Sequence, residues 1–183
     1  MAVAVVRQAV ESDAGVVAGL QLAVWQQVYA ELLPAAVLLA DPEVRAAAWA
    51  ARIGGGAPVL LASEGAEPVG LAAVADPDPD DNAGDNPAGH TAVGRVGEIE
   101  TLLVLPRWAR RGHGGRLLAE AAAGLRRRGA ESARWWAPEA DRSVERFLAG
   151  VSWFPDGGRR VLDTGEGSLA EVRYAGPLDL VLH

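Results

Sequence analysis

Residues 97–118, GEIETLLVLPRWARRGHGGRLL, constrain the fold of this 183-residue chain more than any other segment. They begin with an apolar run that is typical of a buried strand, and they end in apolar residues at helical spacing. Between these, residues 107–118 hold four arginines and three glycines. The pattern predicts a strand that leads through a glycine-rich loop into the start of a helix.

This loop has the composition of an anion-binding site. The first N–H groups of a helix have no intrahelical acceptor, and the helix dipole is positive there. Glycines leave these groups accessible, and arginines beside them add charge and hydrogen bonds. We therefore expect a phosphate or pyrophosphate site, with a tight turn beside a solvated arginine cluster as the alternative. The candidate residues are Arg110, Arg111, Gly112, His113, Gly114 and Gly115.

Several other chemistries are excluded by residues that the chain lacks. Leu117 breaks the spacing of a dinucleotide-binding fingerprint, and no Walker sequence occurs. All 17 basic residues are arginine, so no mechanism can depend on lysine. Without cysteine the chain has no disulfide and no cysteine nucleophile. The three histidines are far apart in sequence, so we expect no metal site.

The rest of the sequence predicts alternating strands and helices in one domain. Ser12 or Asp13 offers a side-chain cap for a helix that ends near Tyr29, and residues 32–53 form one or two more helices. Further helices cover 114–129 and 141–150. Residues 76–90 read as a solvated loop. We expect strands at 2–10, 58–63, 69–75, 93–105, 132–138, 152–163 and 169–178. The strands at 58–63 and 69–75 should form a hairpin. The predicted fold class is α/β with α+β character: a mixed, mostly antiparallel sheet flanked by helices.

Net charge and hydropathy limit the partners and the location. The formal net charge of −7 argues against nucleic-acid binding, although seven arginines between 107 and 128 keep that reading open. No run of about 20 apolar residues occurs, so we expect no membrane partner. The N-terminal residues lack the pattern of a secretory signal, and we expect a cytoplasmic protein.

The segment 97–118 closely resembles the coenzyme A signature of the GNAT superfamily of N-acetyltransferases. In that family a strand that ends in V-x-P leads into [QR]-x-x-G-x-[GA] at a helix start. Val104, Pro106, Gly112 and Gly114 match this spacing, whereas Ala109 stands where the signature has Gln or Arg. The likeness extends over most of the chain, so we expect a single N-acetyltransferase domain spanning 1–183.

The resemblance implies that acetyl-CoA is the co-substrate and an amine is the acceptor. Backbone groups of Leu102, Leu103 and Val104 would bind the pantetheine arm like an added strand. The amides of 110–115 would hold the pyrophosphate. Asp141 stands where many members have an asparagine at their last helix, and it joins the cofactor-binding candidates. The protein would act as a monomer or a homodimer.

Acetyl transfer to an amine requires a base, because an ammonium group has no lone pair. Glu98 and Glu100 lie two apart on a predicted strand and therefore share a face. Glu98 is six residues before Val104, where some family members place a catalytic glutamate; the alternative is a solvated strand residue. Glu100 is a second catalytic candidate, or it binds the charge of the acceptor. Without cysteine, direct transfer in a ternary complex is the expected route.

One departure from the family pattern leaves the activity open. Leu148 stands where many members have the tyrosine that protonates the leaving thiolate, and only Tyr29 and Tyr174 could replace it. A non-catalytic acyl-CoA-binding module is therefore the alternative function. Trp25 and Tyr29 are either core residues or the wall of the acceptor pocket.

Overall fold

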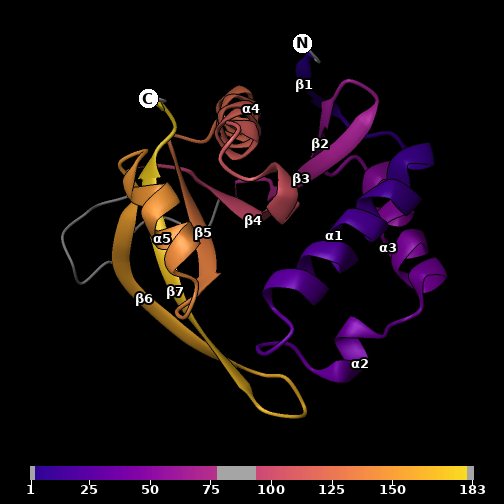
Figure 1. The fold of residues 1–183 in the computed structure, drawn as a ribbon. Coiled ribbons are helices and arrows are strands. Elements are labelled where there is room, and N and C mark those ends of the chain that lie inside the picture. Colours follow the sequence, from indigo (N-terminus) through magenta and orange to yellow (C-terminus); the bar gives the residue numbers. More distant parts are fainter. Residues whose placement is uncertain (1–2, 78–93, 181–183) are drawn as a thin grey trace. The chain divides into compact units, whose positions relative to one another are not determined.

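The structure is a computed structural model that describes residues 3–77 and 94–180 (Figure 1). Its chain divides into two compact units. Unit 1 comprises the described residues of Met1–Ala73 and Thr101–Ala121, and unit 2 those of Val74–Glu100 and Ala122–His183. Strand β4 (Val96–Val104) and helix α4 (His113–Arg127) each contribute residues to both units.

The strands of unit 1 are antiparallel neighbours in the order β1-β2-β3-β4. Strands β1 (Ala4–Gln8) and β2 (Val59–Glu64) pair with each other, and β2 forms a hairpin with β3 (Glu67–Ala75). Gly65 makes the tight turn of this hairpin with a φ of 61°, which glycine adopts at little cost. The predicted hairpin is therefore confirmed.

Helices α1 (Ala14–Val28), α2 (Ala35–Leu38) and α3 (Pro42–Gly54) lie wholly in unit 1. Helix α1 packs beside α3, with the short α2 between them in the chain (Figure 1). The Asp41 carboxylate caps α3 by accepting from the Glu43 N–H at 2.8 Å. The core of this unit is apolar: its buried members include Val17, Val24, Trp49, Leu61, Leu71 and Leu103.

The predicted side-chain cap of α1 is wrong. Asp13 does precede the helix, but its carboxylate makes no capping bond to α1. It instead accepts from the Val10 N–H at 2.8 Å and from both terminal nitrogens of Arg7 at 2.7 and 2.8 Å. The bidentate guanidinium contact is the stronger partner, and it ties β1 to the turn before α1.

Unit 2 combines one parallel strand pair with an antiparallel hairpin. Its strands have the order β4-β5-β7-β6. Strands β4 and β5 (Ser132–Pro138) are parallel, as the intervening α4 requires. Strand β5 pairs with β7 (Ser168–Pro177), and β7 pairs with β6 (Phe154–Asp163) in a long hairpin (Figure 1).

Helices α4, which contributes residues to both units, and α5 (Arg142–Ala149) begin and end within two residues of the predicted bounds. The Asp141 carboxylate caps α5, and Gly129 follows α4 with a φ of 88°. The apolar stripe predicted for α4 is buried throughout, at Leu117, Leu118, Ala121, Ala122 and Leu125. The predicted fold class is thus confirmed: seven strands in the described residues, mostly antiparallel, with flanking helices. Most of the predicted loop at 76–90 lies outside the described residues.

The Asp13 contacts predict an acid-sensitive contribution to stability. Hydrogen bonds from Arg7, and then from Val10, lower the pKa of Asp13 to about 2. A lowered carboxyl pKa stabilises the fold above the unfolded-state pKa of about 4, and this contribution disappears as the pH falls toward 2. Asp13→Asn should therefore lower the free energy of unfolding by about 1 kcal/mol at pH 7. In denaturation experiments the difference should shrink below pH 4; a difference independent of pH would contradict the assignment.

Gly70 lies where β3 approaches β4 too closely for a side chain. A Cβ at Gly70 would lie 2.6 Å from the backbone oxygen of Leu103, so one strand would have to move. We expect Gly70→Ala to lower the free energy of unfolding by about 1–3 kcal/mol. Gly19→Ala is the matched control, because the exposed Gly19 in α1 has open space around it and should gain about 0.5–1 kcal/mol. Equal effects of the two substitutions in thermal unfolding would refute the close approach.

Candidate functional site

The loop between β4 and α4 has an unusual backbone. After β4 the chain makes one 3₁₀ turn, η2 (Pro106–Trp108), and reaches α4 through two residues of positive φ. These are Arg110 at 61° and Gly112 at 82°. A non-glycine residue in this region costs about 1–2 kcal/mol, and such strain concentrates at functional sites. Both residues are exposed, so the loop presents its backbone to solvent.

Arg116, a residue of α4, makes hydrogen bonds that hold the start of the helix. The Arg116 N–H donates to the Gly112 carbonyl at 3.0 Å, which closes the first helical turn. The Arg116 side chain also donates to the Arg111 carbonyl at 3.1 Å. Carbonyl oxygens of the loop therefore point toward Arg116. The N–H groups of the first turn are those that an anion binds at a helix start.

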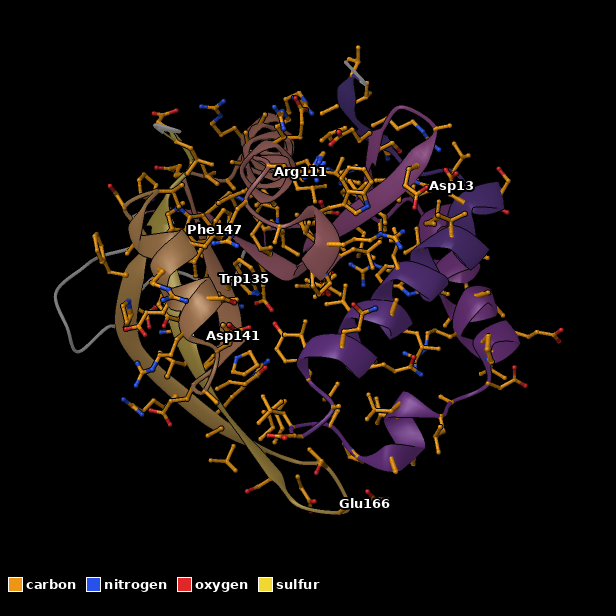
Figure 2. All side chains as sticks on the ribbon, in the orientation of Figure 1. Asp13, Arg111, Trp135, Asp141, Phe147 and Glu166 are labelled. Atoms are coloured by element: carbon orange, nitrogen blue, oxygen red, sulfur yellow. The ribbon has the colours of Figure 1, made fainter. Side chains whose placement is uncertain are left out.

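A carboxylate from β2 contacts both sides of Gly112. His113 is 2% exposed, and its Nε2 lies 2.9 Å from Oε2 of Glu64. Arg111 Nη1 lies 3.8 Å from Oε1 of the same carboxylate. The Arg111 guanidinium also stacks over the Trp108 ring at 4.7 Å, and Trp108 meets the His113 ring edge-on at 6.0 Å. Figure 2 labels Arg111 in this loop.

The predicted pantetheine-binding residues form the last part of β4. Leu102 and Leu103 are buried and Val104 is half-buried. Leu103 packs in the core of unit 1, and the Leu105 N–H donates to the Val69 carbonyl at 2.9 Å. Side-chain packing therefore fixes this backbone segment within unit 1.

Glu98 is paired rather than simply solvated. Its Oε2 accepts a hydrogen bond from Arg134 Nε at 2.7 Å, and each side chain is about a quarter exposed. The two residues are register partners on the parallel strands β4 and β5, which places them side by side. Glu100 follows two residues later with an exposed side chain and shares this face by alternation. These contacts lie within unit 2.

The sequence model of the acetyltransferase (GNAT) family matches residues 25–149, about two thirds of the chain. The chain belongs to the GNAT acetyltransferase family. The match includes β4, the glycine loop, α4 and α5. The coenzyme A signature identified in the sequence therefore lies within the family match.

Solved structures of GNAT proteins share the fold. Ribosomal-protein-alanine N-acetyltransferase from Brucella melitensis has 19% identity and a TM-score of 0.70, over 94% of this chain and 99% of that protein. The yncA protein of Salmonella typhimurium, solved with its cofactor acetyl-CoA, has 21% identity and a TM-score of 0.64, over 96% and 94%. The paiA N-acetyltransferase of Thermoplasma acidophilum, solved with coenzyme A, has 13% identity and a TM-score of 0.63, over 96% and 99%. No curated protein sequence matched.

Within residues 3–77 and 94–180, no group of three or more His, Cys, Asp or Glu side chains could hold a metal ion. In the same part of the chain, no helix is long and apolar enough to cross a membrane. The single-domain boundary of 1–183 stays a prediction.

Two residues in and before α5 depart from the GNAT pattern, and each has a structural role. Leu148 is fully buried. The Asp141 carboxylate accepts hydrogen bonds from the Ser143 and Val144 N–H groups at 2.9 and 3.1 Å and so caps α5. Asp141 is labelled in Figure 2. Tyr174, on β7, is 8% exposed, and burial raises the pKa of its hydroxyl.

The predicted acceptor residues Trp25 and Tyr29 lie at the C-terminal end of α1. Both are half-buried and pack against the core of unit 1. The Arg45 guanidinium lies over the Trp25 ring at 4.8 Å, and Arg45 also donates to the Val37 carbonyl at 2.7 Å. Their packing role is established by these contacts, and an acceptor role stays a prediction.

Three residues that contact the predicted site were missed in the sequence. Glu64 contacts His113 across 49 positions, and Arg134 contacts Glu98 across 36. Arg116 lies in the signature itself, but only its contact with the Arg111 carbonyl reveals its role. Register between predicted strands was the one signal that could have paired Arg134 with Glu98.

Proposed function

We propose that this chain is an N-acetyltransferase that transfers an acetyl group from acetyl-CoA directly to a primary amine. The acceptor is a small molecule or a protein or peptide amino group. The observation that carries the proposal is the left-handed backbone at Arg110 and Gly112, which opens the start of α4 to an anion. Membership of the GNAT family supports the same co-substrate.

The loop would bind the pyrophosphate mainly through its backbone. The first-turn amides of α4, at 112–115, donate to phosphate oxygens, and the helix dipole favours the negative charge. Arg110 and Arg111 are exposed and add charge-assisted hydrogen bonds. The backbone of 102–104 would hydrogen-bond the pantetheine arm as an added strand.

Glu98 would accept the proton of the amine, directly or through a water molecule. Arg134 Nε holds Oε2 of this carboxylate and fixes its orientation. The neutral amine then attacks the acetyl carbonyl carbon, and a backbone N–H of β4 stabilises the oxyanion. The C–S bond breaks, coenzyme A leaves as the thiolate, and the second proton lost by the nitrogen passes to that thiolate or to water. Glu100 would bind the charge of the acceptor or replace Glu98, and Trp25 with Tyr29 would line the acceptor pocket.

A non-catalytic acyl-CoA-binding module is the second candidate, and the burial of Leu148 favours it. Neither a leucine nor the buried Tyr174 is an obvious proton donor. A thiol has a pKa of roughly 8 to 9 in water, however, so the thiolate can leave without a strong acid. Thiol release from acetyl-CoA with a broad amine and peptide panel separates the two candidates.

The same proposal includes a cytoplasmic location and a single domain over 1–183, as a monomer or homodimer. It requires no metal ion and no nucleic acid. Strongly salt-dependent binding of DNA or RNA would count against this part of the proposal.

The pyrophosphate site predicts a specific effect of Gly112→Asp. The substitution adds a side chain and a negative charge beside the phosphates, and acetyl-CoA affinity should fall at least tenfold, about 1.4 kcal/mol. Gly165→Asp is the matched control: Gly165 also has a positive φ, at 80°, and its side-chain direction is open. Calorimetry should give wild-type affinity for the control. Equal acetyl-CoA affinities for the two variants would contradict the proposed pyrophosphate site.

The base assignment predicts a pH-dependent defect in Glu98→Gln. Turnover at neutral pH should fall on the order of 10²-fold while acetyl-CoA affinity is unchanged. A higher pH should restore part of the rate, because more of the amine is then neutral. Initial rates between pH 6 and 10 measure this. A wild-type rate across that range would transfer the role to Glu100 or to water.

A further inference from the structure

The Glu64 carboxylate occupies an unexpected position for a site that binds an anion. It ends β2, and its two oxygens contact the residues on either side of Gly112. A negative charge here repels the pyrophosphate that the loop is proposed to hold. Glu64 must therefore make a favourable contribution to binding that outweighs this repulsion.

His113 supplies the geometry for such a contribution. It is the first residue of α4, so its amide belongs to the proposed anion site while its imidazole is 2% exposed. A carboxylate only accepts hydrogen bonds, so the Nε2 that lies 2.9 Å from Glu64 must carry a proton. This bond fixes the direction of the buried ring. A fixed ring in turn fixes the backbone at the start of the helix.

Arg111 and Trp108 close the same cluster on the other side of Gly112. Arg111 Nη1 is 3.8 Å from Glu64, and its guanidinium covers the Trp108 ring at 4.7 Å. Trp108 contacts His113 edge-on, so Glu64, His113, Trp108 and Arg111 form a closed cycle of contacts. A loop that is already ordered loses less conformational entropy when a ligand binds.

We propose that Glu64 and His113 are positioning residues that hold the loop 110–115 in its pyrophosphate-binding conformation before acetyl-CoA binds. The inference rests on the proposed function, because acetyl-CoA is the ligand of that loop. Neither side chain touches the phosphates: Glu64 acts through the His113 ring and the Arg111 guanidinium, and His113 acts through its own backbone.

The direction in which Glu64→Leu changes acetyl-CoA affinity separates a positioning role from electrostatic repulsion. Glu64→Leu removes both the charge and the acceptor: repulsion alone predicts tighter binding of acetyl-CoA, and positioning predicts weaker binding. We expect the dissociation constant from calorimetry to rise about tenfold. Glu64→Gln keeps an acceptor for His113 and should stay within about threefold of wild type. If Glu64→Leu does not fold, Glu64→Ala takes its place, since the Glu64 side chain is 21% exposed.

Two further measurements exclude a general structural defect. S-acetylpantetheine lacks the pyrophosphate, so Glu64→Leu should acetylate an amine from it at the wild-type rate. With acetyl-CoA, the kcat/KM of Glu64→Leu should fall about tenfold because KM rises. His113→Leu should also weaken acetyl-CoA binding, and the double variant should be no weaker than Glu64→Leu, because the contact between Glu64 and His113 is already lost in each single variant.

Glu67→Gln is the matched control. Glu67 lies in the same β2–β3 hairpin, but it pairs with Arg107 rather than with 111–113, and its removal should leave affinity within twofold. Wild-type or tighter binding by Glu64→Leu, or an equal loss with S-acetylpantetheine, would overturn the positioning pair alone. Failure of the wild-type protein to bind acetyl-CoA would overturn the proposed function, and this inference with it.

Discussion

The backbone passes from β4 into α4 through two left-handed residues, and the proposed chemistry depends on that turn. Gly112 adopts its φ of 82° at little cost, but Arg110 at 61° is strained. Two neighbours hold this backbone in place: the His113 side chain is buried in unit 1, and the exposed Arg116 side chain donates to the Arg111 carbonyl. In the proposed function, the amides at the start of α4 are the groups that bind the anion.

One face of the sheet in unit 2, where the proposed catalytic residue Glu98 lies, carries paired charges. Ile99, Trp135 and Tyr174 are register partners on one face of its sheet, so Glu98 and Arg134 share the other face. Farther along this other face, Arg160 and Arg173 lie over the Trp136 ring at 4.4 and 5.5 Å. Paired carboxylates offset these cations, including Glu171 with Arg160 and Asp156 with Arg173. These cations are therefore paired with carboxylates of the same unit, and the pair with Arg134 gives the Glu98 carboxylate a fixed orientation.

Periodicity and turn chemistry were sufficient to predict most of the fold. The apolar stripe of α4 and the hairpin around Gly65 depend on residues close in sequence, and both were confirmed. The cap of α1 was wrong because Arg7, from a neighbouring strand, binds the Asp13 carboxylate more strongly than the helix start does. The pair of Glu64 with His113 spans 49 positions and depends on strand register and helix placement together. No local pattern encodes such a contact.

The amide protons of the glycine loop test the central claim most directly. In a ¹⁵N-labelled sample, acetyl-CoA should shift the amide signals of Gly112, His113, Gly114 and Gly115 downfield, as charge-assisted hydrogen bonds to phosphate form. S-acetylpantetheine should leave those four signals in place while it shifts others. If acetyl-CoA binds and the four amides do not respond, the pyrophosphate is held elsewhere and the account of this loop is wrong.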